Sequence, residues 1–240
     1  MVVVLFFIVI IAGLYSCVGH GGASGYIAVM TLFGLAPFII KPTALILNIL
    51  VSGIAAIQFY RSGCFRWSLF WRFALTSVPC AYIGGYFVLP QIYYKYIIVL
   101  VLWFSAMRLF IRPVTSQVET RLIPLPLTLI IGAVLGLLSG LIGVGGGIFL
   151  SPLLILAGWA GNRETAAVAA LFVLVNSCAG LMGFISASHT FPPIALTFSL
   201  AAVCGGIIGS YLGSRKLPML SVQRILSMIL IMAGYKMLFS

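Results

Sequence analysis

A run of glycines interrupts this chain inside an apolar stretch where a helix would otherwise continue. Residues 140–147 read Gly-Leu-Ile-Gly-Val-Gly-Gly-Gly, between apolar segments at 125–139 and 148–156. Within a membrane, non-helical backbone is tolerated only where protein buries it or where it lines a polar cavity. A shorter run, Gly-His-Gly-Gly, occupies residues 19–22. Two such breaks, one in each half of a chain, indicate the substrate site of a membrane transporter.

The composition indicates a multi-pass protein surrounded by membrane lipids. Of the 240 residues, 63% are hydrophobic and only 6% are charged, a balance that soluble globular domains do not have. The net charge of +11 comes from 13 basic residues scattered between apolar runs, so we expect no nucleic-acid partner. Residues 1–12 lack a basic segment, and we expect a first membrane segment there rather than a cleaved signal peptide. The expected location is the inner (plasma) membrane.

The two halves of the chain repeat one pattern in the same order. This duplication predicts a first transmembrane repeat at 1–111, a linker at 112–122 and a second transmembrane repeat at 123–240. The matched segments are 19–22 with 143–146, 41–44 with 163–166, 83–86 with 208–211, and 107–110 with 235–239.

Each repeat is predicted to contain a helix, a glycine break, a shorter helix and three further helices. The second short helix, at 148–158, rises about 16 Å, which is half of a hydrocarbon core of about 30 Å. We therefore expect each break near mid-membrane, at the tip of a re-entrant hairpin. The predicted helices are 2–18, 23–38, 43–60, 69–89 and 93–111, then 123–141, 148–158, 164–185, 192–212 and 221–239.

The basic residues favour inverted over parallel repeats. If each broken pair of helices returns to its own side, ten basic residues face one side of the membrane and three face the other, a strong positive-inside bias. If each pair crosses once, the split is seven to six. We therefore expect an all-α polytopic membrane protein of two inverted repeats, each with a glycine-broken re-entrant helix pair plus three transmembrane helices. The ten are Arg61, Arg66, Arg72, Arg108, Arg112, Arg121, Arg163, Arg215, Lys216 and Arg224, and the three are Lys41, Lys95 and Lys236.

The chemistry of the breaks favours an anion. Each short helix begins at its break, where the unpaired N–H groups carry about half a positive charge. The acidic residues are Glu119 and Glu164, both at predicted loops or helix ends. Without an intramembrane carboxylate, a cation substrate is not expected.

The candidate site combines the breaks with polar residues predicted to lie near them. Ser24 is a candidate cap or ligand hydroxyl. His20 suits a proton-linked ligand, or it bonds only to a neighbouring turn, and both interpretations stay open. Asn48 and Asn176 either face the site or join helices, and Cys17 is a weaker candidate ligand for a sulfur-containing substrate. The predicted substrate-binding residues are Gly19, His20, Gly21, Gly22, Ser24, Asn48, Gly143, Val144, Gly145, Gly146, Gly147 and Asn176.

One segment resembles a known family. Residues 136–154, Gly-Leu-Leu-Ser-Gly-Leu-Ile-Gly-Val-Gly-Gly-Gly-Ile-Phe-Leu-Ser-Pro-Leu-Leu, are similar to the signature of the TauE/SafE family of sulfite-exporter-like permeases. The resemblance implies a carrier for sulfur-containing anions or organic acids, such as sulfite and sulfonates. The first copy departs from this pattern, with His20 in place of Val144 and Ala23 in place of Gly147.

We therefore expect an anion permease working by alternating access, and not an enzyme, with no cofactor and no bound metal. Association with further copies of the chain is left open. Two alternatives also remain, a membrane thiol-redox carrier using Cys17, Cys80 and Cys204, and a non-transporting membrane scaffold. The five cysteines form no CxxC pair and no zinc spacing, and an odd number does not fit a disulfide framework.

Overall fold

The computed structural model describes residues 2–17, 20–61, 63–87, 90–110, 124–187 and 192–215, together with Met228, Ile231 and Tyr235, which are helical. The predicted linker at 112–122 and most of the predicted helix at 221–239 lie outside the described residues. The described part of the chain forms nine helices and no strand. They are α1 (Val2–Cys17), α2 (Ala23–Leu32), α3 (Pro37–Arg61), α4 (Trp67–Tyr86), α5 (Gln91–Phe110), α6 (Leu125–Ile142), α7 (Gly147–Leu156), α8 (Asn162–Ser186) and α9 (Ile194–Arg215).

Four of these helices are long and apolar enough to cross a membrane, which fits a multi-pass membrane protein. Their candidate spans are Phe38–Arg61, Leu125–Ile142, Arg163–Ser186 and Ile194–Tyr211. α1 and α2 are apolar but shorter.

The helices α2 and α7, which follow the two glycine breaks, have the same length and are flanked by left-handed glycines at the same positions. Each has 10 residues, or about 15 Å, half of a hydrocarbon core. Each follows a glycine with left-handed backbone, Gly22 at φ 94° and Gly146 at φ 78°. Each is followed, two residues after its end, by another left-handed glycine, Gly34 at φ 74° and Gly158 at φ 69°. We call α2 and α7 the half-helices.

The hydrogen bonds that end the two half-helices also correspond. After α2, the N–H of Leu35 donates to the carbonyl oxygen of Met30, at 3.0 Å. After α7, the N–H of Trp159 donates to the carbonyl oxygen of Leu154, at 2.9 Å. The two half-helices therefore share local backbone structure despite their different sequences.

The prediction of a helix at 23–38 is wrong at its C-terminal end. α2 ends at Leu32, and the N–H of Gly34 donates to the carbonyl oxygen of Thr31 to close the turn. α3 then begins at Pro37, a residue that suits the first position of a helix because its φ is already helical. Apolar residues continue across the turn, so hydrophobicity alone hid the boundary.

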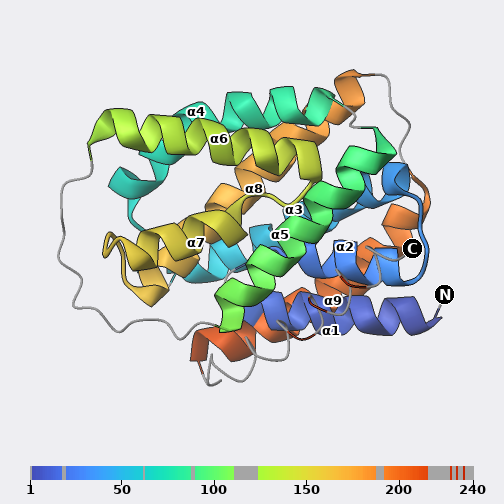
Figure 1. Ribbon diagram of the computed structural model, residues 1–240. Coiled ribbons are helices and arrows are strands. Elements are labelled where there is room, and N and C mark those ends of the chain that lie inside the picture. The colour runs from blue at the N-terminus through green and yellow to red at the C-terminus, as the bar shows by residue number, and fades with distance from the viewer. Residues whose placement is uncertain are drawn as a thin grey trace.

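The helices of the two halves interleave (Figure 1). α4 and α6 lie side by side along the top of the view, α1 and α9 lie along the bottom, and α3 and α8 pass between them. Each of these two pairs joins one helix from each half of the sequence. The two predicted repeats are therefore not separate bodies.

The buried apolar side chains form two large clusters, one around the pair α1 and α9 and the other around the pair α4 and α6. One cluster is formed mainly by α1, α2, α3 and α9, with further residues from α5 and the second break. A second cluster is formed by α4, α6, α7 and α8. A small third cluster, centred on Ala55 and Ala170, joins α3 to α8. Each large cluster thus takes three helices from one half and its fourth helix from the other half.

Glycines let the paired helices touch backbone to backbone. A Cβ built on Gly136 of α6 would overlap the carbonyl oxygen of Ser77 on α4, and one built on Gly209 of α9 would overlap that of Gly13 on α1. Membrane helices associate through such small residues because apolar lipid provides no hydrophobic driving force between them. The contacts fix the register of both pairs.

Replacing Gly136 with alanine should destabilise the protein, because the new methyl group would force α6 away from Ser77. Overpacking of this kind costs about 1–3 kcal/mol. Gly53→Ala is the matched control, since this glycine is also inside a helix and its methyl group would meet only Leu174, at 3.8 Å. Thermal unfolding of the purified protein in detergent measures both variants. Equal melting temperatures for the two would contradict the proposed packing.

Candidate functional site

The two longest described helices, α3 and α8, cross at the centre of the site. Each has 25 residues. They are antiparallel: Leu45 of α3 lies beside Gly180 of α8, and Gly53, further along α3, lies beside Leu174, which comes earlier in α8. At the crossing, the Asn48 Nδ2 of α3 donates a hydrogen bond to Ser177 Oγ of α8, at 3.4 Å. Both of these polar side chains are fully buried.

The two glycine breaks converge on this crossing. A Cβ built on Gly21, in the first break, would lie 2.6 Å from Asn48 Oδ1 and 2.8 Å from Val173 Cγ1. A Cβ built on Gly145, in the second break, would lie 2.8 Å from Asn48 Nδ2 and 2.9 Å from Ser177 Oγ. The same asparagine therefore lies against both breaks. Both positions need glycine, because any larger side chain would displace the polar groups at the crossing.

The backbone of the second break also requires glycine at three positions. Gly143, Gly145 and Gly146 have φ angles of 87°, 77° and 78°, a region that costs other residues about 1–2 kcal/mol. Gly147 has an ordinary helical position, but a Cβ on it would overlap Val173. In the first break Gly22 has a positive φ, and Gly19 lies outside the described residues.

His20 connects the first break to the half-helix of the other copy. Its Nε2 lies 2.9 Å from Ser151 Oγ on α7, within hydrogen-bond distance. Its backbone N–H donates to the carbonyl oxygen of Tyr15, at 3.0 Å, which closes the end of α1. A Cβ built on Gly147 would lie 3.6 Å from His20 Cδ2. The histidine therefore bonds both to its own turn and to the opposite copy.

The half-helices begin beside this crossing without side-chain caps. The N-cap residues are Gly22 for α2 and Gly146 for α7, and neither offers a side chain to the first amide groups. Ser24 was predicted either to cap α2 or to offer a hydroxyl to the ligand; the capping role is wrong, and the ligand role stays a prediction. Ser24 is the second residue of that helix, and its Oγ shares a 2.6 Å hydrogen bond with the Tyr15 hydroxyl. The N-terminal N–H groups and the positive ends of both helix dipoles remain directed toward the breaks.

Two buried polar atoms beside the breaks, and a third where α8 meets α4, have no hydrogen-bond partner. Asn48 Oδ1 is one of them, and Ser139 Oγ is another. The Ser139 Cβ lies 3.5 Å from a Cβ built on Gly146. Asn176 accepts a 2.6 Å hydrogen bond from Ser77 Oγ through its Oδ1, which leaves its Nδ2 unpaired. An unsatisfied buried group costs about 1–3 kcal/mol, so these atoms are available to a bound ligand.

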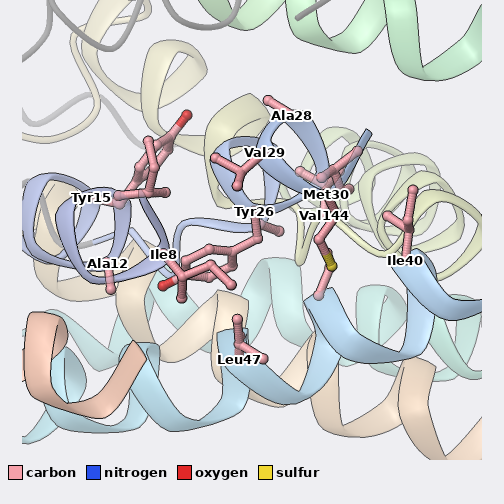
Figure 2. Close-up of a cluster of buried hydrophobic side chains, with 14 of the residues drawn as sticks. Ile8, Ala12, Tyr15, Tyr26, Ala28, Val29, Met30, Ile40, Leu47 and Val144 are labelled. Atoms are coloured by element: carbon pink, nitrogen blue, oxygen red, sulfur yellow. The ribbon is translucent and has the colours of Figure 1, made fainter. Parts of the chain in front are cut away.

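Val144 differs from the other predicted site residues. Its side chain is buried in the apolar cluster of α1, α2 and α3, close to Met30 in the close-up (Figure 2). It can therefore contribute only its backbone to a site.

The sequence reasoning missed the serines of the site, Ser139, Ser151 and Ser177. Serine is common in membrane helices, so its presence alone carries no signal. Position is a usable signal for two of them, since Ser177 follows Asn176 and Ser139 precedes Gly143 by one turn.

Charged side chains contact the described site only at its margins. Glu164, at the start of α8, forms a 3.2 Å ion pair with Arg66 and accepts a hydrogen bond from the N–H of Gly161. Lys41 lies beside Gly143, where a built Cβ would be 3.3 Å from Lys41 Cγ. Its ammonium group donates to three carbonyl oxygens at the C-terminal end of α4, those of Gly84, Gly85 and Phe87. Among the described residues, no carboxylate lies at the breaks.

The thiols and the metal-ligand residues show no catalytic arrangement in the described residues. None of the five cysteines forms a disulfide bond, and Cys17 Sγ donates to the carbonyl oxygen of Gly209 on α9, at 3.0 Å. Within the same residues, no group of three or more His, Cys, Asp or Glu side chains is placed to hold a metal ion.

Comparison with known proteins finds one family and two similar chains. The family described as "Sulfite exporter TauE/SafE" matches residues 4–237. The "Probable membrane transporter protein y4hK" of Sinorhizobium fredii is 38% identical over 239 residues, which cover 98% of this chain and 96% of the relative. The "Probable membrane transporter protein YjnA" of Bacillus subtilis is 24% identical over 245 residues, covering 95% and 96% respectively. No solved structure matches the chain significantly.

The meeting of the two breaks can be tested by cross-linking. In a variant without its native cysteines, the substitutions His20→Cys and Ser151→Cys should allow a short bifunctional thiol reagent to join the two positions, because their side chains are within hydrogen-bond distance. The joined thiols would then be protected from a maleimide mass tag. Each single-cysteine variant is the control and should accept the tag after the same treatment. Full tagging of the double variant would show that the breaks do not meet.

Proposed function

This chain belongs to the TauE/SafE family of sulfite-exporter-like membrane transporters, and on that premise we propose that it carries small anions across the inner membrane by alternating access. The substrates we propose are sulfur-containing anions or organic acids, such as sulfite and sulfonates. The anion binds between the two glycine breaks. The observation that carries this proposal is the convergence of both half-helix N-termini on the crossing of α3 and α8.

Two opposed helix N-termini favour negative charge at one point. Each contributes about half a positive charge through amide groups that have no intrahelical partner. Glycine at positions 21, 145 and 146 lets the backbone approach a ligand closely. A carboxylate, sulfite or sulfonate group has oxygens that can accept hydrogen bonds from both half-helices at once.

The side chains around the breaks support an anion rather than a cation. Asn176 Nδ2 and Ser139 Oγ have no partner and can donate to an oxyanion. Lys41 adds a buried positive charge beside Gly143. Within the described residues the only carboxylate side chain is that of Glu164, and Arg66 already neutralises it. A cation would lack the acidic ligand that membrane cation sites use.

Alternating access requires the site to face each side of the membrane in turn, and inverted repeats provide this by symmetry. We propose repeats at 1–111 and 123–240, joined by a linker at 112–122. Three observations support them. The half-helices are equal in length, the equivalent helices α3 and α8 run in opposite directions, and the pairing of α1 with α9 mirrors that of α6 with α4.

We propose that the cytoplasm faces the end of the molecule where α3 ends and α4 and α8 begin. Arg61 and Arg66 lie there, and the ion pair of Arg66 with Glu164 brings the start of α8 and its Arg163 to the same end. Lys41 lies at the opposite end, against the last turn of α4. An excess of arginine on one side is the positive-inside pattern.

Cysteine accessibility tests the inverted topology. Gly34 and Gly158 are equivalent positions after the two half-helices, and a Cβ on either would meet no atom within 4 Å. In a variant without native cysteines, Gly34→Cys should react with a membrane-impermeant maleimide added outside intact cells. Gly158→Cys should react only after the membrane is opened, because inversion places it on the cytoplasmic side. Labelling of both from the same side would exclude inverted repeats.

Anion-dependent thermal stability of the purified protein tests the function. The panel is sulfite, thiosulfate, sulfate, taurine, sulfoacetate, acetate and chloride. A bound anion at 100 times its dissociation constant stabilises the folded state by about 2.7 kcal/mol. We expect such a shift from at least one sulfur-containing anion or organic acid in the wild type. It should be lost in Gly145→Ala, whose methyl group would displace Asn48 and Ser177.

The control for this experiment is Gly158→Ala. Gly158 has a similar positive φ, 69° against 77° for Gly145, but open space around it. The two variants therefore share the backbone strain, and only Gly145→Ala crowds the site. The proposal fails if the anion stabilises Gly145→Ala as much as the control, or if no anion of the panel stabilises the wild type.

A further inference from the structure

His20 is the titratable side chain of the first break, and the structure places it between the two copies. Its ring Nε2 is 2.9 Å from Ser151 Oγ, a residue of the half-helix α7. The equivalent position of the second break is Val144, whose side chain is buried in an apolar cluster. Among the described residues, His20 thus provides the one imidazole at the proposed anion site, and the second break has no counterpart to it.

The elements packed around His20 bring no carboxylate to it within the described residues. Residues 143–156, which form the second break and α7, contain no acidic or basic residue. The charged side chains of α8 lie at its start, where Glu164 pairs with Arg66. Three other titratable side chains of the surrounding helices already have partners: Tyr15 bonds to Ser24, Cys17 to the carbonyl oxygen of Gly209, and Lys41 to carbonyl oxygens at the end of α4. The same helices also contain Tyr26 and Cys178.

We propose that His20 binds a proton that is transported together with the anion. This inference rests on the proposed anion transport and extends it to the coupling ion. Histidine has an ordinary pKa of about 6.5, so a modest change in its surroundings loads or releases a proton near neutral pH. An arriving anion provides that change, since a negative charge at the half-helix N-termini stabilises the imidazolium form. The loaded site then contains one positive and one negative charge.

Pairing the anion with protonated His20 lowers the energy of moving it through the protein. Moving an isolated charge through an apolar interior is expensive, whereas a paired and hydrogen-bonded charge costs much less. A monovalent anion with protonated His20 makes a neutral cargo. The carrier can then reorient without moving net charge across the membrane.

Ser151 makes the proton and the anion cooperate. With neutral His20 protonated on Nδ1, the Ser151 hydroxyl donates to Nε2. When Nε2 takes up the transported proton, the imidazolium donates to Ser151 Oγ instead. The hydroxyl hydrogen of Ser151 is then released and can point to the anion. Protonation thus adds a donor to the site at the moment when the anion needs one.

Proton uptake on anion binding tests this coupling. The probe is methanesulfonate, which stays monovalent over the whole pH range used, so any proton taken up belongs to the protein. Purified protein in a weakly buffered detergent solution with a pH dye is mixed with methanesulfonate at about pH 7, near the ordinary histidine pKa. The wild type should take up protons, approaching one per bound anion above that pKa. By linkage, the affinity of the wild type for methanesulfonate should fall as the pH rises above that pKa, by up to about tenfold for each pH unit.

Three variants assign the proton. His20→Gln keeps a side chain that can bond to Ser151 but cannot titrate, so it should bind methanesulfonate without proton uptake and without the pH dependence. His189→Gln removes the other histidine of the chain and should behave like the wild type. Ser151→Ala should still take up the proton but bind the anion about tenfold more weakly, since one hydrogen bond to a charged group is lost.

The outcomes separate this inference from the proposed function. Methanesulfonate binding to the wild type without proton uptake overturns the proton coupling and leaves anion transport standing. Equal proton uptake by His20→Gln and the wild type overturns the assignment to His20. Failure of the wild type to bind methanesulfonate or any anion of the earlier panel overturns both. If His20→Gln does not fold, His20→Asn replaces it, and the wild-type measurement decides the coupling by itself.

Discussion

The peptide groups at the two glycine breaks must find their hydrogen-bond partners in the protein, in water or in a ligand, because lipid offers none. The rest of the architecture follows from this need. The long helices α3 and α8 cross directly over the breaks and bring Asn48 and Ser177 to them. The half-helices start at the breaks, so their N-terminal N–H groups are directed to the same region of the protein. A bound anion would accept hydrogen bonds from these N–H groups. The unpaired groups that destabilise the empty protein are therefore the groups suited to hold a ligand.

The close packing around this centre also determines which parts can move. Gly136 against Ser77, and Gly209 against Gly13, hold α6 to α4 and α9 to α1 through backbone contacts. These close backbone contacts oppose sliding within each pair. Relative motion in the proposed alternating-access cycle would be easier between the two large apolar clusters, because the side chains of Leu45 and Leu174 separate α3 from α8. The moving bodies of an alternating-access cycle would then each contain helices from both halves of the sequence, and would differ from the repeats themselves.

The sequence predicted the features that depend on composition and local backbone chemistry. Helical membrane segments follow from hydrophobicity, and the breaks follow from glycine, so both were found without coordinates. The end of α2 was missed because Gly34 turns the chain inside a continuous apolar stretch. The capping role considered for Ser24 was wrong because its hydrogen-bond partner, the Tyr15 hydroxyl, comes from a neighbouring helix. The contacts of Ser139, Ser151 and Ser177 depend on the crossing of α3 and α8 and on the fold of the breaks, so sequence position could mark Ser139 and Ser177 only as candidates.

The two copies share a backbone but differ in chemistry. Gly34 and Gly158 close equivalent turns, and Gly22 and Gly146 begin equivalent half-helices. At the first break, however, a polar histidine occupies the position that apolar Val144 fills in the second. In the proposed alternating-access cycle, symmetry of the backbone would let one site open to both sides, and it would require no symmetry of side chains. A duplicated protein can therefore keep the shape of both breaks through glycine while a single copy acquires the residue that distinguishes its ligand.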